Sequence, residues 1–372
     1  MVFYYESKAS GPVVPVIESA DFIKEVALKY EGALVTFREE LHLVPNSASP
    51  PDKAVVILMP VYNDWQALSL LLPRLDRELA LNNLNARVFL VDDASTIAPS
   101  KSFWSFEYKC IQSIDVLSLR RNLGHQRAIA AGLSYIEANV GCQYVVIMDS
   151  DGEDDPVDVP ELLRKCIAAG NKIVFAARTR RSEGWLFKFL YHQYRLIHFL
   201  LTGIRVRVGN FSVIPVMALK RLVAVSELWN HYAAAVHKAK LPMDVVPTAR
   251  GCRLSGPSQM DIVALVVHGL SAMAVFGDRI GVRLLLLVFL GMLLDLGALL
   301  AVIGVRLFTS WAIPGWATYA TGILFVILIQ MSVVVLVFVF VILASRERAN
   351  FIPTRDYIHM AGAVQRVYEQ TA

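Results

Sequence analysis

Cysteine is scarce in this chain of 372 residues, which has only Cys110, Cys142, Cys166 and Cys252, scattered through the sequence. Their spacing matches no zinc motif, and we expect all four thiols to be reduced. The net charge is only +4, which argues against a nucleic-acid-binding protein, and no internal repeat is visible. Residues 1–53 contain charged residues throughout and no long apolar core, so we expect no signal peptide.

Apolar residues, by contrast, make up 55% of the chain and are concentrated in two runs, residues 284–305 and 317–344. Each run is long enough to cross a hydrocarbon core of about 30 Å as a helix. The alternative, two buried core helices, fits these lengths poorly. Asp295 lies inside the first run, where a charge is costly, and we interpret it as a helix-packing or oligomer contact.

The charges that flank the two runs predict their orientation. Arg279 and Arg283 precede the first run, and Arg346, Arg348 and Arg355 follow the second. The connector, residues 308–316, carries no lysine or arginine. Because positive charge stays on the cytoplasmic side, we expect an integral membrane protein with both termini in the cytoplasm, as in a bacterial inner membrane.

Upstream of these runs, four apolar segments each end in polar residues. The segments are residues 54–59, 88–91, 114–119 and 144–148. The turns that follow them contain Pro60, Tyr62 and Asn63, then Asp92 and Asp93, then Arg121 and Asn122, and last Asp149 and Asp151. Helical patterns lie between the segments, which is typical of an α/β fold with a mostly parallel sheet. Such sheets bind ligands at the carboxyl ends of their strands, so we expect these side chains to line one site.

Asp149 and Asp151 carry the clearest chemical signal. Two carboxylates two residues apart, just past the end of a strand, can converge on one Mg²⁺ or Mn²⁺ ion, which prefers oxygen ligands and can also hold phosphate oxygens. An activated sugar needs this arrangement because its leaving group is a nucleotide diphosphate. The alternative is an acidic turn that only caps the strand.

The motifs P-V-Y-N, V-D-D-x-S-T, R-N-x-G-H-Q and D-x-D-G-E-D-D-P follow one another in the order found in family 2 glycosyltransferases of the GT-A fold. The sequence resembles this family from about residue 54 to the C-terminus. Within the family it is most similar to the polyprenyl-phosphate sugar synthases, the dolichol-phosphate-mannose-synthase-like branch. The resemblance implies a Rossmann-like, mostly parallel sheet, with interfacial amphipathic helices and two transmembrane helices after it.

The resemblance also implies a donor site for a UDP- or GDP-linked sugar. Its residues would be Pro60, Tyr62, Asn63, Asp92, Asp93, Arg121, Asn122 and Asp149, with Asp149 and Asp151 holding Mg²⁺ or Mn²⁺. An alternative for Asp92 and Asp93 is helix capping around Ser95 and Thr96. We interpret His125 as structural.

Two basic clusters predict the acceptor site and the membrane surface. Residues 178–207 hold seven basic residues among many aromatic and aliphatic ones, a pattern that favours a helix lying on an anionic membrane; the alternative is an ordinary surface helix. The resemblance implies that arginines near the first cluster hold the lipid phosphate, and by position Arg178 and Arg181 are the candidates. The second cluster, residues 250–259, resembles a basic run that the family carries ahead of its juxtamembrane helix, and Arg253 and Ser258 are the candidates there. Gln259 stands where the family usually has lysine.

Asn210 departs from the family pattern, because relatives carry aspartate at this place in a G-D-F-R motif. Where the acceptor is a hydroxyl group, an aspartate nearby acts as general base, and asparagine cannot take a proton. A phosphate acceptor is already ionised and needs no base. Asn210 therefore fits a catalytic site that uses a lipid phosphate, and it also fits an inactive enzyme.

The expected organisation is an N-terminal extension (1–53), a catalytic domain (54–256), a juxtamembrane amphipathic helix (257–280), two spans (281–345) and a cytoplasmic tail (346–372). The expected reaction moves a sugar to polyprenyl phosphate by a single displacement with inversion. A lipid alcohol or a glycan is the alternative acceptor, and a catalytically silent sugar-nucleotide-binding scaffold is the alternative of another class. A homo-oligomer is also expected.

Overall fold

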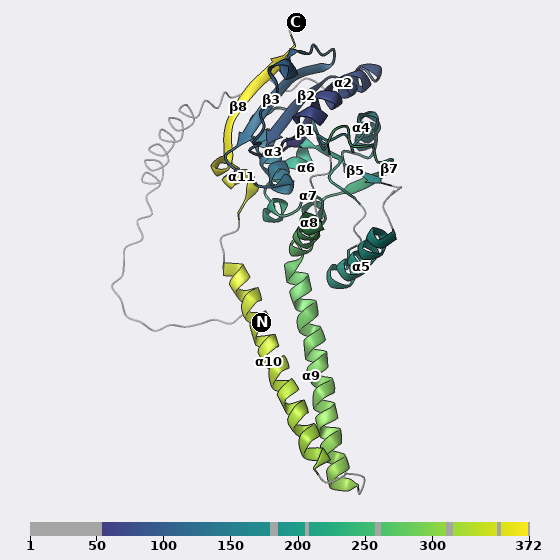
Figure 1. Ribbon diagram of the computed structural model, residues 1–372, viewed down its shortest axis with the longest axis vertical. Helices are drawn as coiled ribbons and strands as arrows, with labels where there is room; N and C mark the ends of the chain where they lie inside the picture. Colours follow the sequence, from purple (N-terminus) through teal and green to yellow (C-terminus); the bar gives the residue numbers. More distant parts are fainter. Residues whose placement is uncertain are drawn as a thin grey trace, which may run out of the picture. The chain divides into compact units, whose positions relative to one another are not determined.

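The computed structural model describes residues 54–178, 185–204, 208–256, 262–309, 315–347 and 351–370. An eight-stranded sheet lies at its centre, in the order β7-β5-β6-β4-β1-β2-β3-β8 (Figure 1). In chain order the strands are β1 (Val55–Val61), β2 (Ala86–Asp92), β3 (Ile111–Leu119), β4 (Tyr144–Ile147), β5 (Ile173–Arg178), β6 (Ser212–Pro215), β7 (Met243–Thr248) and β8 (Ala361–Glu369).

The sheet is mixed but mostly parallel. Strand β1 pairs in parallel with β2 and β4, β2 with β3, and β5 with β7. Strand β6 runs antiparallel to both β4 and β5, and β8 runs antiparallel to β3. The predicted α/β class is confirmed, and the four strands that end in polar residues do point their carboxyl ends toward one edge.

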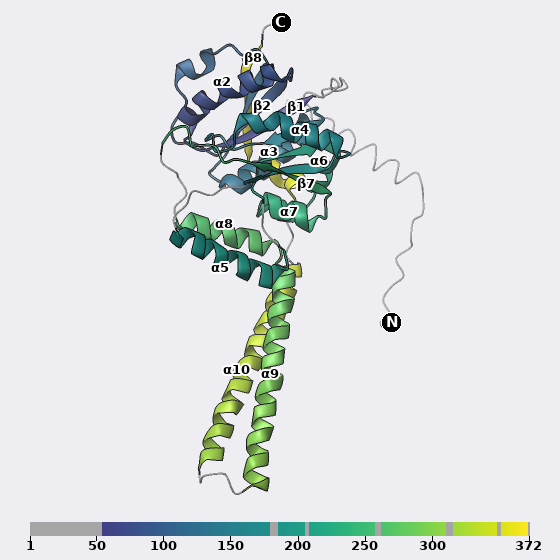
Figure 2. The ribbon, with the colours of Figure 1, turned by 90° about the vertical axis from the view of Figure 1, so that its right-hand side faces the viewer.

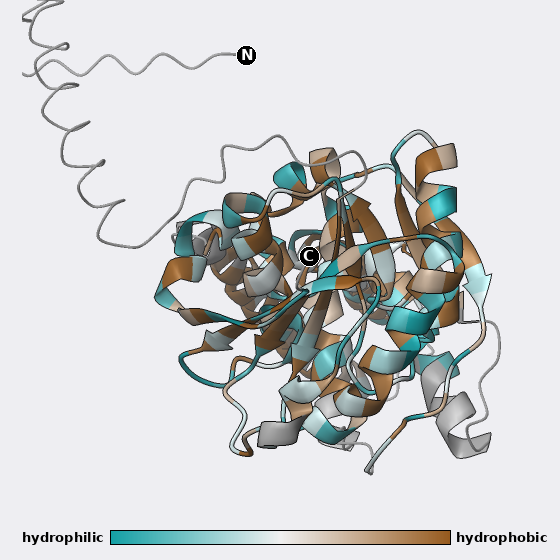
Figure 3. Cartoon of the chain, turned by 90° about the horizontal axis from the view of Figure 1, so that it is seen from above, coloured by the Kyte–Doolittle hydropathy of each residue, from teal (hydrophilic) through white to brown (hydrophobic). Residues whose placement is uncertain are grey.

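Helices cover both faces of the sheet. Helices α2 (Trp65–Leu81) and α4 (Val159–Ala168) pack on one face, and α3 (His125–Asn139), α6 (Val216–Leu222) and α7 (Tyr232–Lys238) pack on the other. In β1, Ile57 and Met59 belong to the first apolar cluster and Val56 and Leu58 to the second. A strand buried on both sides reads as a continuous apolar run, which is why this strand is evident in the sequence. Figure 3 shows these apolar strands at the centre of the fold.

The residues after the second long helix return to the sheet. Helix α11 (Pro353–Asp356) leads to Tyr357, whose hydroxyl accepts a hydrogen bond from Asn139 of α3 (3.1 Å), and β8 then pairs with β3. The backbone N–H of Arg120 donates to the carbonyl of Met360 (3.0 Å). The sequence predicted a tail here and no strand, so the edge strand β8 is a finding of the structure.

Two helices, α9 (Gly277–Phe308) and α10 (Trp316–Glu347), are long and apolar enough to cross a membrane. They pack against each other, as Figures 1 and 2 show, and approach closely where Gly291 faces Met331. Asp295 is buried in α9, 9% exposed, as expected for a packing position.

The base of α9 is tied to the domain that carries the sheet. Arg283 of α9 donates to the carbonyl of Leu200 in α5 (Trp185–Thr202) at 2.7 Å. Lys238 of α7 donates to the carbonyl of Val275 and lies 3.4 Å from Asp278. Helix α8 (Ile262–Ala274) precedes α9 directly, and Figure 2 shows α5 and α8 running crosswise to the two long helices.

Candidate active site

The polar edge of the sheet begins with two loops that form one unit. The backbone N–H of Asn63, after β1, donates to the hydroxyl of Ser95 (2.9 Å), and the side-chain oxygen of Asn63 accepts from the N–H groups of Thr96 and Ile97. Tyr62, beside Asn63, is 37% exposed. The predicted donor residues of β1 and β2 are therefore brought together, with the ring of Tyr62 open to a ligand.

The two carboxylates that end β2 have different partners. Asp92 accepts the N–H of Ser95 (2.9 Å) within a turn; no helix begins at Ser95 or Thr96, so this contact is not the helix cap considered from the sequence. Asp93 is buried and accepts the N–H groups of Leu123 and Gly124 (2.6 and 2.8 Å). Burial raises the pKa of Asp93 although both hydrogen bonds lower it. Asp93 thus fixes the loop that opens α3, where Gly124 supplies the positive φ of 88° that this turn requires.

Asp149 and Asp151 are held by the loop that follows β4. The carboxylate of Asp154, 2% exposed, accepts the N–H of Asp149 (3.0 Å), and Asp151 accepts the N–H of Glu153 (2.9 Å). The side chains of Asp149 and Asp151 are 25% and 18% exposed. Burial and the charge of Asp149 raise the pKa of Asp151. The loop therefore keeps two carboxylates close together at a cost in repulsion, which is common at functional sites.

The donor set at this loop fits a hard divalent cation. Two carboxylates supply oxygen ligands and leave the remaining positions for phosphate oxygens. Among the described residues, no three His, Cys, Asp or Glu side chains are grouped as a complete metal site. Asp149 and Asp151 would hold the ion only together with the diphosphate of a bound ligand.

Arg253, predicted to bind the acceptor phosphate, instead bridges two carboxylates. Its guanidinium donates to Asp151 (2.9 Å) and to Asp64 (2.5 Å), and all three side chains are less than one-fifth exposed. Arg253 neutralises the site in this structure, and a cation at Asp151 would replace part of that charge. Its role in phosphate binding stays a prediction.

We expect Arg253→Gln to lower the melting temperature of the protein in EDTA by about 5 °C, because two partly buried carboxylates lose their counter-charge. Saturating Mn²⁺ should restore much of this loss, since the ion supplies positive charge at Asp151. Differential scanning fluorimetry of the detergent-solubilised protein measures both effects. Arg250→Gln is the control, because Arg250 pairs with Glu153 and not with Asp151. Equal melting temperatures of Arg253→Gln and wild type in EDTA would contradict the counter-charge role.

A polar network that the sequence did not predict connects the donor side to Asn210. Nε2 of His125 lies 3.3 Å from Asp149 Oδ1 and 2.9 Å from Asn210 Nδ2. Gln126 donates to Asn210 (3.1 Å) and accepts the backbone N–H of Tyr232 (2.8 Å). Burial is the largest single effect and lowers the pKa of His125, but the carboxylates of Asp149, Asp154 and Asp151 together raise it by more. His125 is therefore part of this polar network. In the sequence it was a lone histidine, and for that reason we interpreted it as structural.

The other predicted residues are placed as follows. Pro60 is buried in β1, and Arg121 and Asn122 are exposed before α3, where they can reach a ligand at the polar edge. The side chain of Arg178, and all of Arg181 and Ser258, lie outside the described residues.

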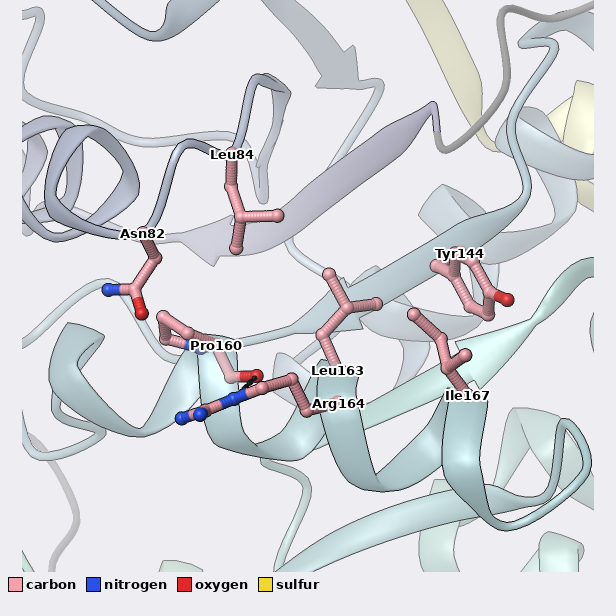
Figure 4. Close-up of a pocket in the computed structure, with 7 residues that line it drawn as sticks. All are labelled: Asn82, Leu84, Tyr144, Pro160, Leu163, Arg164 and Ile167. Atoms are coloured by element: carbon pink, nitrogen blue, oxygen red, sulfur yellow. Dashed lines mark hydrogen bonds between the residues drawn. The ribbon is translucent and has the colours of Figure 1, made fainter.

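A small cavity of about 160 Å³ lies beside Tyr144, at the amino end of strand β4 (Figure 4). It is lined by Asn82, Leu84, Tyr144, Pro160, Leu163, Arg164 and Ile167. Tyr144 is the first residue of β4, whereas Asp149 follows its last, so this cavity is separate from the candidate site.

Comparison with known proteins gives a match of residues 56–227 to the family described as glycosyl transferase family 2. This chain carries a family 2 glycosyltransferase domain. The uncharacterized glycosyltransferase YkcC of Bacillus subtilis is 25% identical over 70% of this chain and 80% of its own length. The undecaprenyl-phosphate 4-deoxy-4-formamido-L-arabinose transferase of Klebsiella pneumoniae is 28% identical over 36% of this chain and 39% of its own length.

Among solved structures, mannosyl-3-phosphoglycerate synthase from Rubrobacter xylanophilus is 15% identical, with a TM-score of 0.44 over 65% of this chain and 75% of that one. Glucosyl-3-phosphoglycerate synthase from Mycobacterium tuberculosis, solved with Mn²⁺ and UDP-glucose, is 14% identical, with a TM-score of 0.44 over 62% and 79%. The family predicted from the four motifs is confirmed by the sequence match, and the chain is a glycosyltransferase.

Proposed function

We propose that this glycosyltransferase transfers a sugar from a nucleotide-diphosphate sugar to polyprenyl phosphate at the cytoplasmic surface of a membrane. The observation that carries the proposal is the Asp149–Asp151 pair, held at the polar edge of the sheet in a chain that continues into two membrane-length helices. The relative from Klebsiella pneumoniae, named for transfer to undecaprenyl phosphate, supports this class of acceptor.

The donor would lie along the loops after β1, β2 and β4, with its diphosphate at Asp149 and Asp151. A bound Mg²⁺ or Mn²⁺ ion would neutralise the charge that develops on the departing diphosphate. Tyr62 would contact the base, and Asp92, Arg121 and Asn122 the rest of the nucleotide. An oxygen of the acceptor phosphate attacks the anomeric carbon, the bond from that carbon to the diphosphate breaks, and the electron pair leaves with the diphosphate. One displacement inverts the anomeric configuration.

The surroundings of Asn210 favour a phosphate over an alcohol as the acceptor. Both ends of the Asn210 amide have partners, His125 at 2.9 Å and Gln126 at 3.1 Å. An amide in this place cannot remove a proton from an alcohol, whereas a phosphate needs no proton removed. Asn210 would position the reactants and not act as a base.

The sheet topology supports the proposed orientation in the membrane. Strand β7 precedes α9 and β8 follows α10, yet both strands belong to one sheet. If α9 and α10 each cross the membrane once, the catalytic domain and the segment after α10 must lie on the same side. We propose that this side is the cytoplasm, because arginines precede the first apolar run and follow the second.

The test is a transfer assay with full-length protein in nanodiscs, Mg²⁺ or Mn²⁺, and a panel of radiolabelled UDP- and GDP-sugars. Farnesyl phosphate and farnesol are offered as matched acceptors. We expect label in the organic phase with farnesyl phosphate and one donor, and none with farnesol or with EDTA present. Transfer to farnesol would assign an alcohol acceptor. Donor binding without transfer to either acceptor would favour the silent scaffold.

A further inference from the structure

Two histidine rings meet where the catalytic domain joins the membrane-side helices. His231 is the N-cap of α7, and His268 lies in the middle of α8, which leads directly into α9. The ring centroids are 4.8 Å apart. His231 is buried and His268 is partly buried. Neither side chain has a place in the donor site described above.

The local structure determines what the ring of His231 can offer. Its Nδ1 accepts the backbone N–H of Ala234 (3.4 Å). Burial, followed by the charge of His268, lowers the pKa of His231 to about 3, so the ring is neutral at pH 7. A neutral imidazole that accepts at Nδ1 carries its hydrogen on Nε2 and can donate from there. His231 thus presents a hydrogen-bond donor whose orientation is fixed by a helix cap.

The pair is linked to the groups of the candidate active site. Burial lowers the pKa of His268; the charge of His125 lowers it further and that of Asp149 raises it, so both groups of the donor site act on this ring. Tyr232, next to His231, donates its backbone N–H to Gln126 of the Asn210 network (2.8 Å). The pair is therefore adjacent to the reacting centre.

Helix α8, which carries His268, has an exposed surface that suits a lipid. Val266, Val267 and Leu270 are each 55% exposed, on the same helix as His268. Exposed aliphatic side chains on a helix next to a membrane span are typical of a helix at the bilayer surface. A lipid whose tail lies along this surface would bring its head group to the level of the histidines. Arg253, which the sequence analysis named as a candidate for binding the lipid phosphate, already forms ion pairs with Asp64 and Asp151.

We propose that His231 and His268 bind the phosphate of the lipid acceptor, an inference that rests on the proposed function. Each neutral ring would donate one N–H hydrogen bond to a phosphate oxygen. The alternative is that the two rings only pack α7 against α8. The two roles differ in one respect: packing needs the rings, whereas phosphate binding needs their N–H groups.

The test measures binding, without turnover, of farnesyl phosphate, farnesol, inorganic phosphate and UDP to the full-length protein in nanodiscs. His268→Phe keeps a ring but removes the donors, and His268→Gln keeps a donor. His231→Asn keeps a good N-cap residue but removes the imidazole. His237→Phe, in the same helix α7, is the control; the pKa of His237 is also lowered by burial.

We expect His268→Phe and His231→Asn each to weaken farnesyl phosphate binding about tenfold, with farnesol and UDP unchanged, and His268→Gln to lose less. Wild-type binding by both variants, or equal losses for farnesol, would overturn the inference in favour of packing. Loss of UDP affinity would assign the pair to the donor. Inorganic phosphate that binds as tightly as farnesyl phosphate would overturn the lipid assignment. The proposed function has its own test: wild-type protein that binds farnesyl phosphate through the two histidines but transfers no sugar to it would contradict the proposed function and leave the binding inference standing.

Discussion

Replacing Asp151 with asparagine is expected to lower the rate of sugar transfer about 1,000-fold while leaving the protein folded. Asparagine keeps the size of the side chain but removes the negative charge that would hold a cation at the diphosphate. A loss of this size corresponds to ~4 kcal/mol of transition-state stabilisation, within the range for groups that stabilise developing charge. The measurement is initial rate against donor concentration in the presence of Mn²⁺.

The stability of the same variant provides an independent check. Burial and the charge of Asp149 raise the pKa of Asp151, so the folded protein is better suited to a neutral group at this position. We therefore expect the melting temperature of Asp151→Asn in EDTA to equal or exceed that of wild type. The gain in stability and the loss of activity would have one cause, the partly buried negative charge that the site maintains at Asp151 beside Asp149.

Asp158→Asn is the matched control for Asp151→Asn. Asp158 lies in the same acidic stretch, but its side chain makes no capping hydrogen bond at the start of α4. Its transfer rate should stay within about twofold of wild type, as is usual for a residue outside the site. If Asp151→Asn retained more than a tenth of the wild-type rate, the carboxylate pair would not be the diphosphate centre.

The sequence predicted the polar edge of the sheet because that edge is built from local patterns. Strand β1 is buried on both faces, so it reads as an unbroken apolar run that stops at a polar turn, and β2 and β4 do the same. Parallel pairing then places their carboxyl ends together. The position of the Asp149–Asp151 pair required no knowledge of contacts between distant residues.

The features that the sequence did not predict all depend on contacts between distant residues. Strand β8 is half exposed and shows no strict alternation, and its partner β3 precedes it by about 250 residues. The sequence did not predict the ion pair of Arg253 with Asp64, because the two residues are 189 positions apart in the chain. His125 reads as a lone histidine until β4 places Asp149 beside it. The spacing of residues in the sequence does not predict contacts of this kind.

The loop that holds the carboxylates is itself locked to the segment that leads to the membrane. The N–H of Gly251 donates to the carbonyl of Glu153 and the N–H of Leu254 to that of Asp151, both at 2.9 Å. Arg250 adds a two-pronged ion pair with Glu153. A β-carbon on Gly251 would lie 2.6 Å from the carbonyl oxygen of Gly152, a backbone atom that cannot rotate away.

We therefore expect Gly251→Ala to lower kcat/KM for the donor about 10- to 100-fold, because overpacking of ~1–3 kcal/mol must be relieved by moving the carboxylate loop. The affinity for Mn²⁺ in the presence of UDP, measured by electron paramagnetic resonance of the free ion, should fall with it. Gly277→Ala is the control, since a β-carbon there meets nothing within 4 Å. Full activity of Gly251→Ala would show that the loop tolerates the shift. A parallel loss of activity and Mn²⁺ affinity would show that the segment of residues 250–254, which precedes α8 in the chain, sets the position of the Asp149–Asp151 pair.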